Sequence, residues 1–521
     1  MANKVHIKNG KIIDGTGAIG FIGDILIEGD TIVDILAGGS IINDVDEVID
    51  ATGFVVSPGF IDAHAHSDAY IILEPDAPSK ISQGITIEIN GQCGGSIAPR
   101  YGEARLSSDW AALLGERLTW RSLAEYRAVF AAANPAINTV QFIGHNTLRS
   151  AVVGYAARAA SEDELKTMER MLAAAMDEGG WGLTTGLIYQ PGKYSTPSEV
   201  ERLSRIAAER GGIYATHMRS EGDAILEAID EVIALARATG IRAEISHLKT
   251  SGKANWHKID AVIDKVAGGI DEGVLLGADR YPFCAAGTDL DIVLPDWAQE
   301  GAAKGEMERF ADPALRDRIV AELNASPRDW STVMIGGTWH AENKIFSGRR
   351  VSEICGEMTV GERIVKILEK DGCKTGAFFF GMSEENLNRI MGIDWIVPGS
   401  DASLRAPWGP LGADYPHPRA YATMPEFLRL ALNASCSSVE RVVERMTSIP
   451  AARFGIRRRG VLKRGNFADI AIWSESEFKG QSTYAKPHQF SLGMKCVMVN
   501  GKISYRDGRF TGERAGRFLE K

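Results

Sequence analysis

Short apolar runs alternate with long amphipathic stretches between about residues 54 and 450. The short runs are rich in Val, Ile and Thr, which is typical of buried strands, whereas the stretches between them have the spacing of helices. Ser161 and Glu164 have the spacing of a capping box and predict the start of one such helix. The runs predicted as strands are Val55–Val56, Ile85–Ile89, Thr139–Ile143, Gly182–Tyr189, Gly212–Thr216, Arg242–Ser246, Val274–Asp279 and Trp395–Pro398.

This alternation predicts an α/β fold, because neighbouring parallel strands need a crossover helix between them. Eight strands with intervening helices predict a (β/α)8 TIM-type barrel, which we assign to residues 58–451. More than a hundred residues separate the last two predicted strands, far more than a loop requires. We therefore expect an inserted segment at about residues 285–345, near the barrel mouth.

The two ends of the chain carry the same local pattern. Each has a strand, an Asn-Gly pair and a second strand, and the pairs Asn9-Gly10 and Asn500-Gly501 predict hairpins with type I′ turns. Further strand patterns follow the first pair and precede the second. We therefore expect one small β-sandwich-like domain built from residues 1–57 and 452–521, with the barrel inserted between its halves.

Composition and charge exclude several classes of protein and partner. The 521 residues are 45% hydrophobic and 24% charged, a balance that excludes a disordered or low-complexity chain. The formal net charge of −10 disfavours nucleic acid as a partner, because phosphate binding depends on Lys and Arg. No apolar run is long enough to span a membrane, and no signal peptide is visible. The six cysteines include no Cys-x-x-Cys pair, which favours a reducing, cytoplasmic location. The oligomeric state stays open.

Residues with metal-ligand chemistry follow several predicted strands. In a barrel the carboxyl ends of the strands converge on one rim, where active sites of this fold lie. His64 and His66 are two positions apart and therefore project from the same face of their strand. Imidazoles, one thiolate and one carboxylate together suit a borderline metal such as zinc. The candidate ligands are His64, His66, Cys93, His217, His247 and Asp401.

Each candidate ligand could instead have a purely structural role. One histidine at a strand end is more often a buried core residue than a ligand, and an isolated cysteine is more often a small hydrophobe. Five His and Cys residues at the ends of four strands, with an aspartate on a fifth, are hard to explain in this way. For Cys93 alone, the residues around it leave a ligand role and a core role equally open. The remaining cysteines are interpreted as buried structural residues.

A set of motifs along nearly the whole chain resembles the D-aminoacylase (N-acyl-D-amino-acid deacylase) family of the amidohydrolase superfamily. The His-x-His motif alone would indicate only the superfamily. Cys93 and the absence of a lysine on the fourth predicted strand point to this family, because many binuclear relatives carry a carbamylated lysine there. The matching motifs are Pro58–His66, Gln92–Gly95, Gly144–Arg149, Gly182–Tyr189, Ala215–Glu221, Ser246–Lys249, Asp279–Phe283, Ser400-Asp401, His417–Arg419, Met446–Gly455 and Gly465–Asp469.

The resemblance implies an enzyme that uses zinc to hydrolyse the amide bond of N-acyl-D-amino acids. It implies one tightly bound zinc on Cys93, His217 and His247. A second, weaker metal position would consist of His64, His66 and Asp401, with Cys93 able to bridge, and Asp401 would act as the general base. For the carboxylate of the small-molecule substrate it implies Arg419, assisted by Lys249, Tyr189 and Tyr281.

Two other functions are compatible with this fold. One is hydrolysis of cyclic amides, as in dihydroorotases and hydantoinases, and the missing lysine on the fourth strand argues against it. The other is a non-catalytic scaffold that has kept the amidohydrolase fold, and the complete set of candidate ligands argues against it. Which amino-acid side chain and acyl group are preferred cannot be derived from these residues, and the D configuration rests on the resemblance alone.

Overall fold

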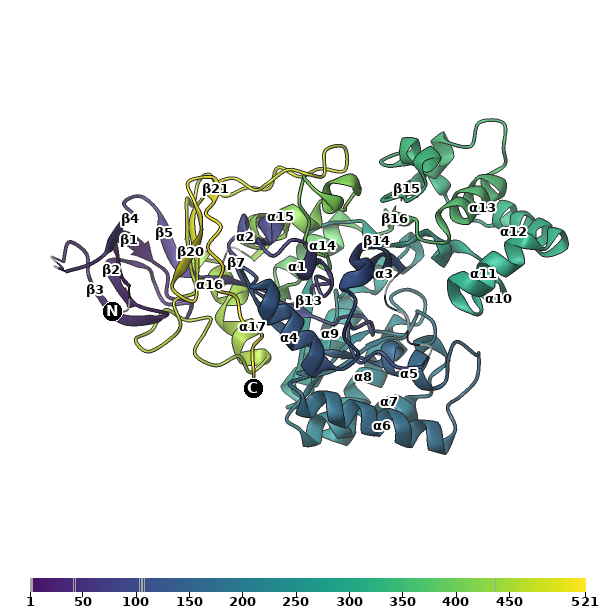
Figure 1. Cartoon of the computed structure of the whole chain (residues 1–521), viewed down its shortest axis with the longest axis horizontal. Helices are drawn as coiled ribbons and strands as arrows, with labels where there is room; N and C mark the ends of the chain where they lie inside the picture. Colours follow the sequence, from purple (N-terminus) through teal and green to yellow (C-terminus); the bar gives the residue numbers. More distant parts are fainter. Residues whose placement is uncertain are drawn as a thin grey trace.

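The computed structural model describes residues 3–521 except 41, 43, 103, 105, 107 and 436, so Cys436 lies outside the described residues. Figure 1 shows three parts along the long axis: a small β-domain, the barrel, and a mainly helical segment at the far end from the β-domain. The five described cysteines form no disulfide bond with one another. In the described ranges, no helix combines the length and apolar character needed to cross a membrane.

The barrel is built from parallel strands in the order in which they occur along the chain. β8 and β9 are two parts of one strand, so the described residues contribute eight strand positions. The ring closes where Ala63 donates its backbone N–H to Pro398 at 3.0 Å and Ala65 pairs with Ala402. The strands are β6 (Phe60–Asp62), β7 (Ile85–Asn90), β8 (Asn138–Gln141), β9 (Ile143–Gly144), β10 (Gly182–Gly186), β11 (Ile213–His217), β12 (Arg242–Ile245), β13 (Leu276–Arg280) and β17 (Ile396–Pro398).

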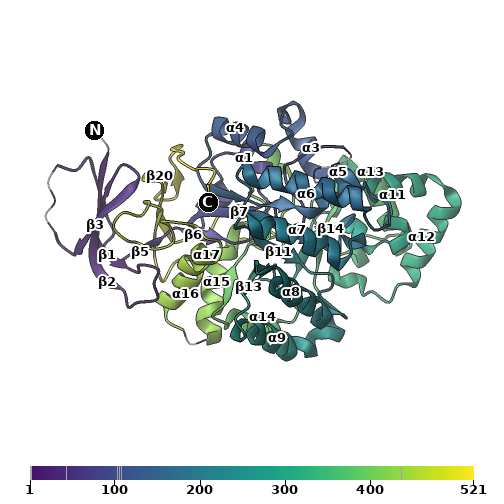
Figure 2. The same ribbon diagram turned by 90° about the horizontal axis from the view of Figure 1, so that it is seen from below.

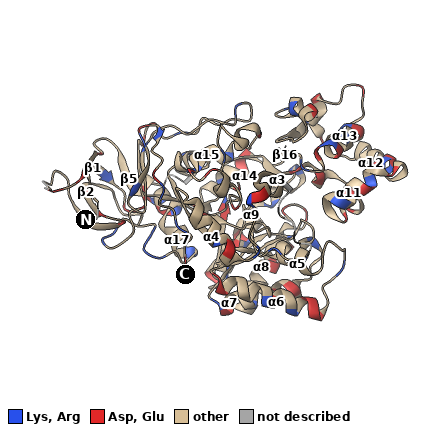
Figure 3. Cartoon of the chain, in the orientation of Figure 1, with Lys and Arg blue, Asp and Glu red and all other residues tan. Residues whose placement is uncertain are grey.

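Helices surround these strands (Figure 2). The predicted capping box is confirmed, since Ser161 and Glu164 cap the first turn of α6 reciprocally. Acidic and basic residues both occur along the outer helices (Figure 3), and Arg202 of α7 pairs with two glutamates of α6. The helices are α1 (Tyr70–Leu73), α2 (Pro78–Ile81), α3 (Ser108–Leu114), α4 (Leu123–Ala133), α5 (His145–Val152), α6 (Glu162–Asp177), α7 (Pro197–Glu209), α8 (Ile225–Thr239), α9 (Ile259–Asp271), α14 (Glu384–Met391), α15 (Arg419–Ser435), α16 (Val439–Met446) and α17 (Ser448–Arg453).

The small β-domain joins both ends of the chain in one sheet. Its strand order is β21-β20-β19-β18-β5-β1-β2-β3, with β4 beside β1. The two halves meet where β5 pairs antiparallel with β18, and valine and isoleucine side chains from both halves form a shared core. The strands are β1 (Lys4–Ile12), β2 (Phe21–Glu28), β3 (Thr31–Ala37), β4 (Glu47–Asp50), β5 (Val55–Pro58), β18 (Ile470–Trp473), β19 (Met494–Val499), β20 (Lys502–Arg506) and β21 (Arg509–Phe510).

Two local predictions near the N-terminus are wrong. Val55–Val56 is not a barrel strand but part of β5 in the small-domain sheet, and the barrel starts with β6 after Gly59. A Cβ atom on Gly59 would lie 2.2 Å from Thr86, so this close passage requires glycine. Asn9-Gly10 forms a bulge within β1, because the buried Asp24 carboxylate accepts the Asn9 backbone N–H at 2.8 Å.

The second Asn-Gly prediction is confirmed. Asn500 and Gly501 join β19 to β20 in an antiparallel hairpin, and both have positive φ angles, 48° and 76°. The same dipeptide therefore forms a turn at one end of the chain and a bulge at the other. The difference lies in tertiary contacts such as that of Asp24 with Asn9, which the local sequence does not contain.

The segment between β13 and β17 packs around a hydrophobic core of its own. Its antiparallel sheet has the order β14-β16-β15, so this separately packed segment continues beyond residue 345, the end expected from the sequence. It forms the end of the molecule opposite the small β-domain (Figures 1 and 2). Its elements are β14 (Ala286–Asp289), α10 (Asp296–Gln299), α11 (Ala302–Ala311), α12 (Pro313–Ala325), β15 (Val333–Ile335), α13 (Val360–Asp371) and β16 (Gly376–Phe379).

Candidate metal centre

Two histidines follow the first barrel strand directly. His64 and His66 come after β6 at alternate positions, and both rings lie at the barrel rim near the ends of β7 and β17. His64 Nε2 lies 3.3 Å from Cys93 Sγ, and His66 Nε2 lies 3.0 Å from Asp401 Oδ1. His64 is fully buried, whereas the His66 side chain is 25% exposed. The His-x-His pair is thus brought together with two other predicted ligands.

Cys93 lies in a strained turn after β7. Its φ angle is 53°, a region that residues other than glycine rarely adopt. The following Gly94 donates its N–H to Thr184 Oγ1 at 3.3 Å, and its carbonyl accepts the N–H of Thr147 at 3.2 Å. A Cβ atom on Gly144 would lie 2.2 Å from the Gly94 carbonyl oxygen. The Gly144–Arg149 motif, for which the sequence indicated no role, therefore supports the turn that carries Cys93.

The fifth and sixth barrel strands contribute the other two histidines. His217 ends β11, and His247 follows β12 with a φ angle of 41°. The centroids of the two rings are 4.5 Å apart, and His247 Nε2 lies 3.4 Å from Cys93 Sγ. Both nitrogens of the buried His217 ring lack a hydrogen-bond partner among the described residues. Glu221 Oε2 lies 3.6 Å from Nε2, beyond hydrogen-bond distance, so a neutral ring has a lone pair that accepts no hydrogen bond, which is what a metal ligand requires.

The six predicted ligands form two clusters that share Cys93. One consists of Cys93, His217 and His247, the other of His64, His66, Cys93 and Asp401, and within each the ligand atoms lie within 4.8 Å of one another. Burial alone would raise the pKa of the Cys93 thiol, but His64 and His247 outweigh burial and lower the pKa well below its usual value. The thiolate is the form that binds metals. The donor atoms therefore suit zinc, and two ions could share the sulfur.

Two carboxylates that the sequence did not single out orient the imidazoles. Asp279 Oδ2 lies 3.2 Å from His64 Nδ1, and Asp279 Oδ1 accepts the backbone N–H of His247 at 2.9 Å. Glu221 Oε1 lies 2.9 Å from His247 Nδ1. At His64 the carboxylate on the remote nitrogen fixes the proton there and leaves Nε2 free to bind a metal. His247 Nδ1 also lies 2.8 Å from Lys249 Nζ, a donor that competes with Glu221 for this nitrogen. Asp279 and Glu221 lie within the motifs quoted above, but only the fold brings them to the histidines.

Asp401 lies between the second cluster and an arginine. It follows β17, has a φ angle of 50°, and its Oδ2 accepts a hydrogen bond from Arg419 Nη1 at 2.7 Å. Burial would raise the pKa of Asp401, but Arg419 and the facing imidazoles outweigh burial and hold the pKa well below its usual range. The carboxylate is therefore ionised at neutral pH. Oδ2 is held by the guanidinium, while Oδ1 faces the histidines.

The four predicted substrate-binding residues all lie at this rim. The Tyr189 ring centroid is 4.9 Å from that of His217, and the Arg419 guanidinium carbon is 4.7 Å from the centroid of the buried Tyr281 ring. Lys249 pairs with Glu221. The sequence did not indicate that both cations already have a carboxylate partner inside the protein.

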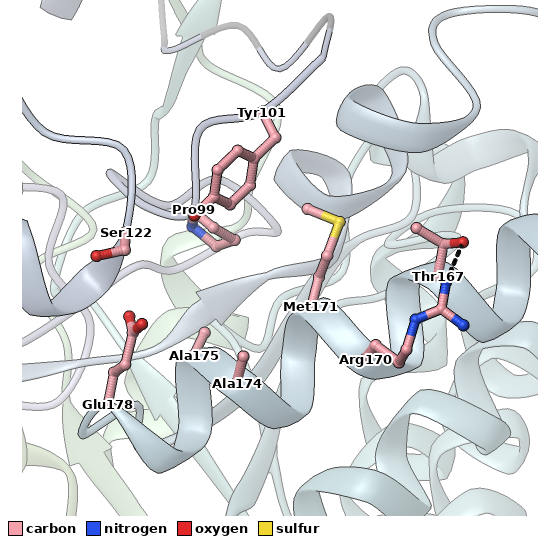
Figure 4. Close-up of a pocket in the computed structure, with 9 residues that line it drawn as sticks. All are labelled: Pro99, Tyr101, Ser122, Thr167, Arg170, Met171, Ala174, Ala175 and Glu178. Carbon is pink, nitrogen blue, oxygen red and sulfur yellow. Dashed lines mark hydrogen bonds between the residues drawn. The ribbon is translucent and has the colours of Figure 1, made fainter.

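Figure 4 shows a surface groove whose lining residues differ from those of the metal centre. It is lined by one face of α6, including Arg170 and Met171, and by the segment around Tyr101. Arg170 Nη2 donates to Thr167 Oγ1 at 3.0 Å across one turn of the helix. None of the candidate metal ligands or substrate-binding residues lines this groove.

The closed barrel, the composite β-domain and the two clusters that share a cysteine define an amidohydrolase. Residues 47–330, more than half of the chain, match the profile described as Amidohydrolase family. The chain is 31% identical to an N-acyl-D-glutamate deacylase and 30% identical to a D-aminoacylase, both from Alcaligenes xylosoxydans xylosoxydans. Each match covers 99% of this chain, and 96% and 97% of the respective relatives. The chain therefore belongs to the D-aminoacylase (N-acyl-D-amino-acid deacylase) family.

A solved structure agrees with this assignment. N-acyl-D-glutamate deacylase from Bordetella bronchiseptica, complexed with zinc and a phosphonate inhibitor that mimics the tetrahedral intermediate, superimposes with a TM-score of 0.84. The two sequences are 30% identical, and the match covers 100% of both chains. The predicted fold class, a TIM-type barrel with a β-sandwich-like domain from both termini, is confirmed.

Proposed function

We propose that this enzyme uses zinc to hydrolyse the amide bond of N-acyl-D-amino acids, giving a carboxylate and a free D-amino acid. The observation that carries the proposal is the pair of clusters sharing Cys93, with Asp401 and Arg419 beside them. The D configuration is inferred from the names of the relatives, which act on N-acyl-D-glutamate or are called D-aminoacylases.

Cys93, His217 and His247 would hold one zinc tightly, because three protein ligands leave a coordination position open for water or substrate. His64, His66 and Asp401 would form a second, weaker position with Cys93 as a bridge. When bound, zinc supplies a Lewis acid for the amide carbonyl and lowers the pKa of water. Asp279 would keep the remote nitrogen of His64 protonated, so that its Nε2 faces the metal position, and Glu221 Oε1 lies beside the remote nitrogen of His247.

Asp401 would serve as the general base. Arg419 holds Oδ2, so Oδ1 is the atom positioned to take a proton from the attacking water. Oδ1 then returns that proton to the amide nitrogen as the amine leaves. The ionised state favoured by Arg419 and the imidazoles keeps this acceptor available at neutral pH.

The α-carboxylate of the substrate would bind at Arg419, with Lys249, Tyr189 and Tyr281 around it. Arg419 Nε is buried without a partner among the described residues, so the guanidinium has a donor left for a substrate while Nη1 stays with Asp401. Since one arginine contacts both the base and the substrate, binding of the carboxylate would be coupled to the position of Asp401.

The alternatives are less well supported. β10 contains no lysine that could be carbamylated, which argues against cyclic-amide hydrolysis of the binuclear type. All six predicted ligands are present in two compact clusters, which argues against a non-catalytic scaffold.

The deciding experiment combines a metal count with a substrate screen. Purified enzyme is analysed for zinc by mass spectrometry and assayed with N-acetyl-D-amino acids, their L enantiomers, and cyclic amides such as dihydroorotate and hydantoins. We expect near-stoichiometric zinc and hydrolysis of D substrates. Hydrolysis of cyclic amides alone, or no hydrolysis by zinc-loaded enzyme, would overturn the proposal.

A further inference from the structure

Arg280, the last residue of β13, is a buried cation with unused donors. Arg280 comes directly after Asp279, whose carboxylate orients His64. Only 1% of Arg280 is exposed to solvent. Nη2 donates to the Phe283 carbonyl at 2.9 Å and approaches Met382 Sδ at 3.0 Å. Nε and Nη1 are buried and have no hydrogen-bond partner among the described residues. Because buried, unpaired charges are strongly destabilising, such a group indicates a missing anionic partner.

Other buried cations of the described chain are compensated within the protein. Arg445 also lacks a carboxylate, but its Nε and Nη1 donate to the carbonyls of Ile396 and Met391, both at 2.9 Å. The buried lysines and arginines that contact a carboxylate are Lys80, Arg149, Lys249, Arg419 and Arg459. Among these described side chains, Arg280 differs in having two donor atoms unpaired and no carboxylate within salt-bridge distance.

Arg280 lies beside the proposed α-carboxylate site. Its guanidinium carbon is 4.0 Å from the centroid of the Tyr281 ring, and that of Arg419 is 4.7 Å from the same centroid. The Tyr281 hydroxyl is buried and also lacks a partner. The two guanidinium groups are therefore close enough for one substrate molecule with two carboxylates to reach both.

Tyr484 adds a further donor from the small-domain segment between β18 and β19, which crosses to the barrel (Figure 1). His417 Nδ1 accepts the Arg419 backbone N–H at 3.0 Å, so in the neutral ring the proton is on Nε2. Nε2 then donates to the Ala285 carbonyl at 3.1 Å and to the Tyr484 hydroxyl oxygen at 3.0 Å. The Tyr484 hydroxyl hydrogen is thereby left for another acceptor.

We propose that Arg280, with the hydroxyls of Tyr281 and Tyr484, forms a second carboxylate subsite, so that the preferred substrates are N-acyl-D-amino acids with an acidic side chain. This inference rests on the proposed function and deepens it. The relatives do not decide the preferred side chain, since an N-acyl-D-glutamate deacylase and a D-aminoacylase match at 31% and 30% identity. A carboxylate is the anion that an arginine fork binds bidentately.

The competing outcome is an apolar side chain. The rings of Phe378 and Phe380 lie 6.0 Å and 4.8 Å from that of Tyr484, and Phe283 packs on His417. These aromatic rings would favour an apolar substrate side chain at the same position. The unpaired charge of Arg280 favours an acidic substrate side chain over an apolar one. An apolar group that excluded water from an unpaired guanidinium would be strongly unfavourable.

The test compares N-acetyl-D-glutamate with N-acetyl-D-glutamine, which has the same shape without the charge, and with N-acetyl-D-methionine. Wild-type enzyme should prefer glutamate over glutamine by about 100-fold in kcat/KM. Arg280→Met should reduce this ratio by about 100-fold, while Arg280→Lys, which keeps the charge but loses the fork, should reduce it less. Arg445→Met removes a buried arginine elsewhere and should leave the ratio unchanged.

The outcomes separate this inference from the proposed function. Equal rates with glutamate and glutamine, or a preference for methionine, would overturn the subsite and leave the deacylase intact. A wild-type preference for glutamate that survives Arg280→Met would also overturn it. Should Arg280→Met not fold, the wild-type ratio together with that of Arg280→Lys still decides. Failure of zinc-loaded enzyme to hydrolyse any N-acetyl-D-amino acid would overturn the proposed function itself.

Discussion

Two carboxylates beside the metal clusters, Asp401 and Glu221, differ in their pKa values from two carboxylates of the inserted segment, Asp291 and Glu306. At the rim Asp401 pairs with Arg419, Glu221 pairs with Lys249, and the pKa of each carboxyl is held well below its usual range despite burial. In the insertion, burial raises the pKa of Asp291 to about 8, with Glu306 adding to the effect. Burial likewise raises the pKa of Glu306 to about 7, against a hydrogen bond from Cys373.

The difference in pKa shows which of these interior carboxyls stay ionised at neutral pH. An ionised carboxylate is expensive to bury unless a cation faces it, and the rim supplies those cations next to the metal clusters. The insertion supplies none close to Asp291, so at neutral pH that carboxyl is favoured in its protonated form. Negative charge is thus kept at Asp401 and Glu221, next to the candidate ligands, whereas the carboxyl of Asp291 is packed in its neutral form.

The most severe test of the rim is removal of the shared sulfur. Cys93→Ala takes a ligand from both clusters at once, so purified protein should lose its tightly bound zinc and all measurable activity. Metal is counted by mass spectrometry and activity is measured on the same samples. Cys355→Ala, a half-buried cysteine in the insertion, is the matched control and should retain both. A metallated, active Cys93→Ala enzyme would remove Cys93 from the site.

Substitution of Asp401 should separate chemistry from metal binding. Asp401→Asn keeps the shape but not the basicity, so kcat should fall by about 10²–10⁴-fold. The tight zinc should remain, since Cys93, His217 and His247 are untouched. Complete loss of zinc from this variant would instead make Asp401 an essential ligand and would show that the two clusters are not independent.

Glu221→Gln tests the negative charge that Glu221 brings to the site, and its expected effect is smaller than that of Asp401→Asn. The amide keeps the shape of the side chain but loses the negative charge that faces His247 and Lys249, so zinc affinity or kcat should fall by about 10–100-fold. Affinity is measured by competition with a chelator. Glu231→Gln is the control, because Glu231 of α8 pairs with Arg219 rather than with a candidate ligand. Equal zinc affinity and kcat in Glu221→Gln and wild type would mean that the pairing does not support the site.

The sequence predicted the barrel and the family but not the partners within the site. Periodicity and strand-end residues indicated the rim, because those signals are local. Val55–Val56 was misassigned because a strand that enters the small-domain sheet has the same composition as one that enters the barrel. The ion pairs of Asp401 with Arg419 and of Glu221 with Lys249 link residues that are 18 and 28 positions apart. Local sequence patterns do not predict contacts between residues so far apart.

The smallest expected effect concerns the insertion and its response to pH. Asp291 and Glu306 have pKa values raised to about 8 and about 7, so between about pH 4 and pH 8 the folded state holds protons that the unfolded chain has released. The stability of the insertion should therefore fall as pH rises through this window and level off above it. The thermal unfolding midpoint of the full enzyme should drop by several degrees between about pH 5 and pH 8.5.

Asp291→Asn combined with Glu306→Gln should flatten this dependence, because neither amide can ionise and each resembles the protonated acid. Asp296→Asn, an exposed acid of the same segment with a 92% exposed side chain, should leave the wild-type slope unchanged. Activity per bound zinc should be close to that of wild type in both proteins, since neither change touches the rim. A pH slope that persists in the double variant would place its origin outside the insertion, and the contrast between the two sets of carboxylates would then lose its thermodynamic meaning.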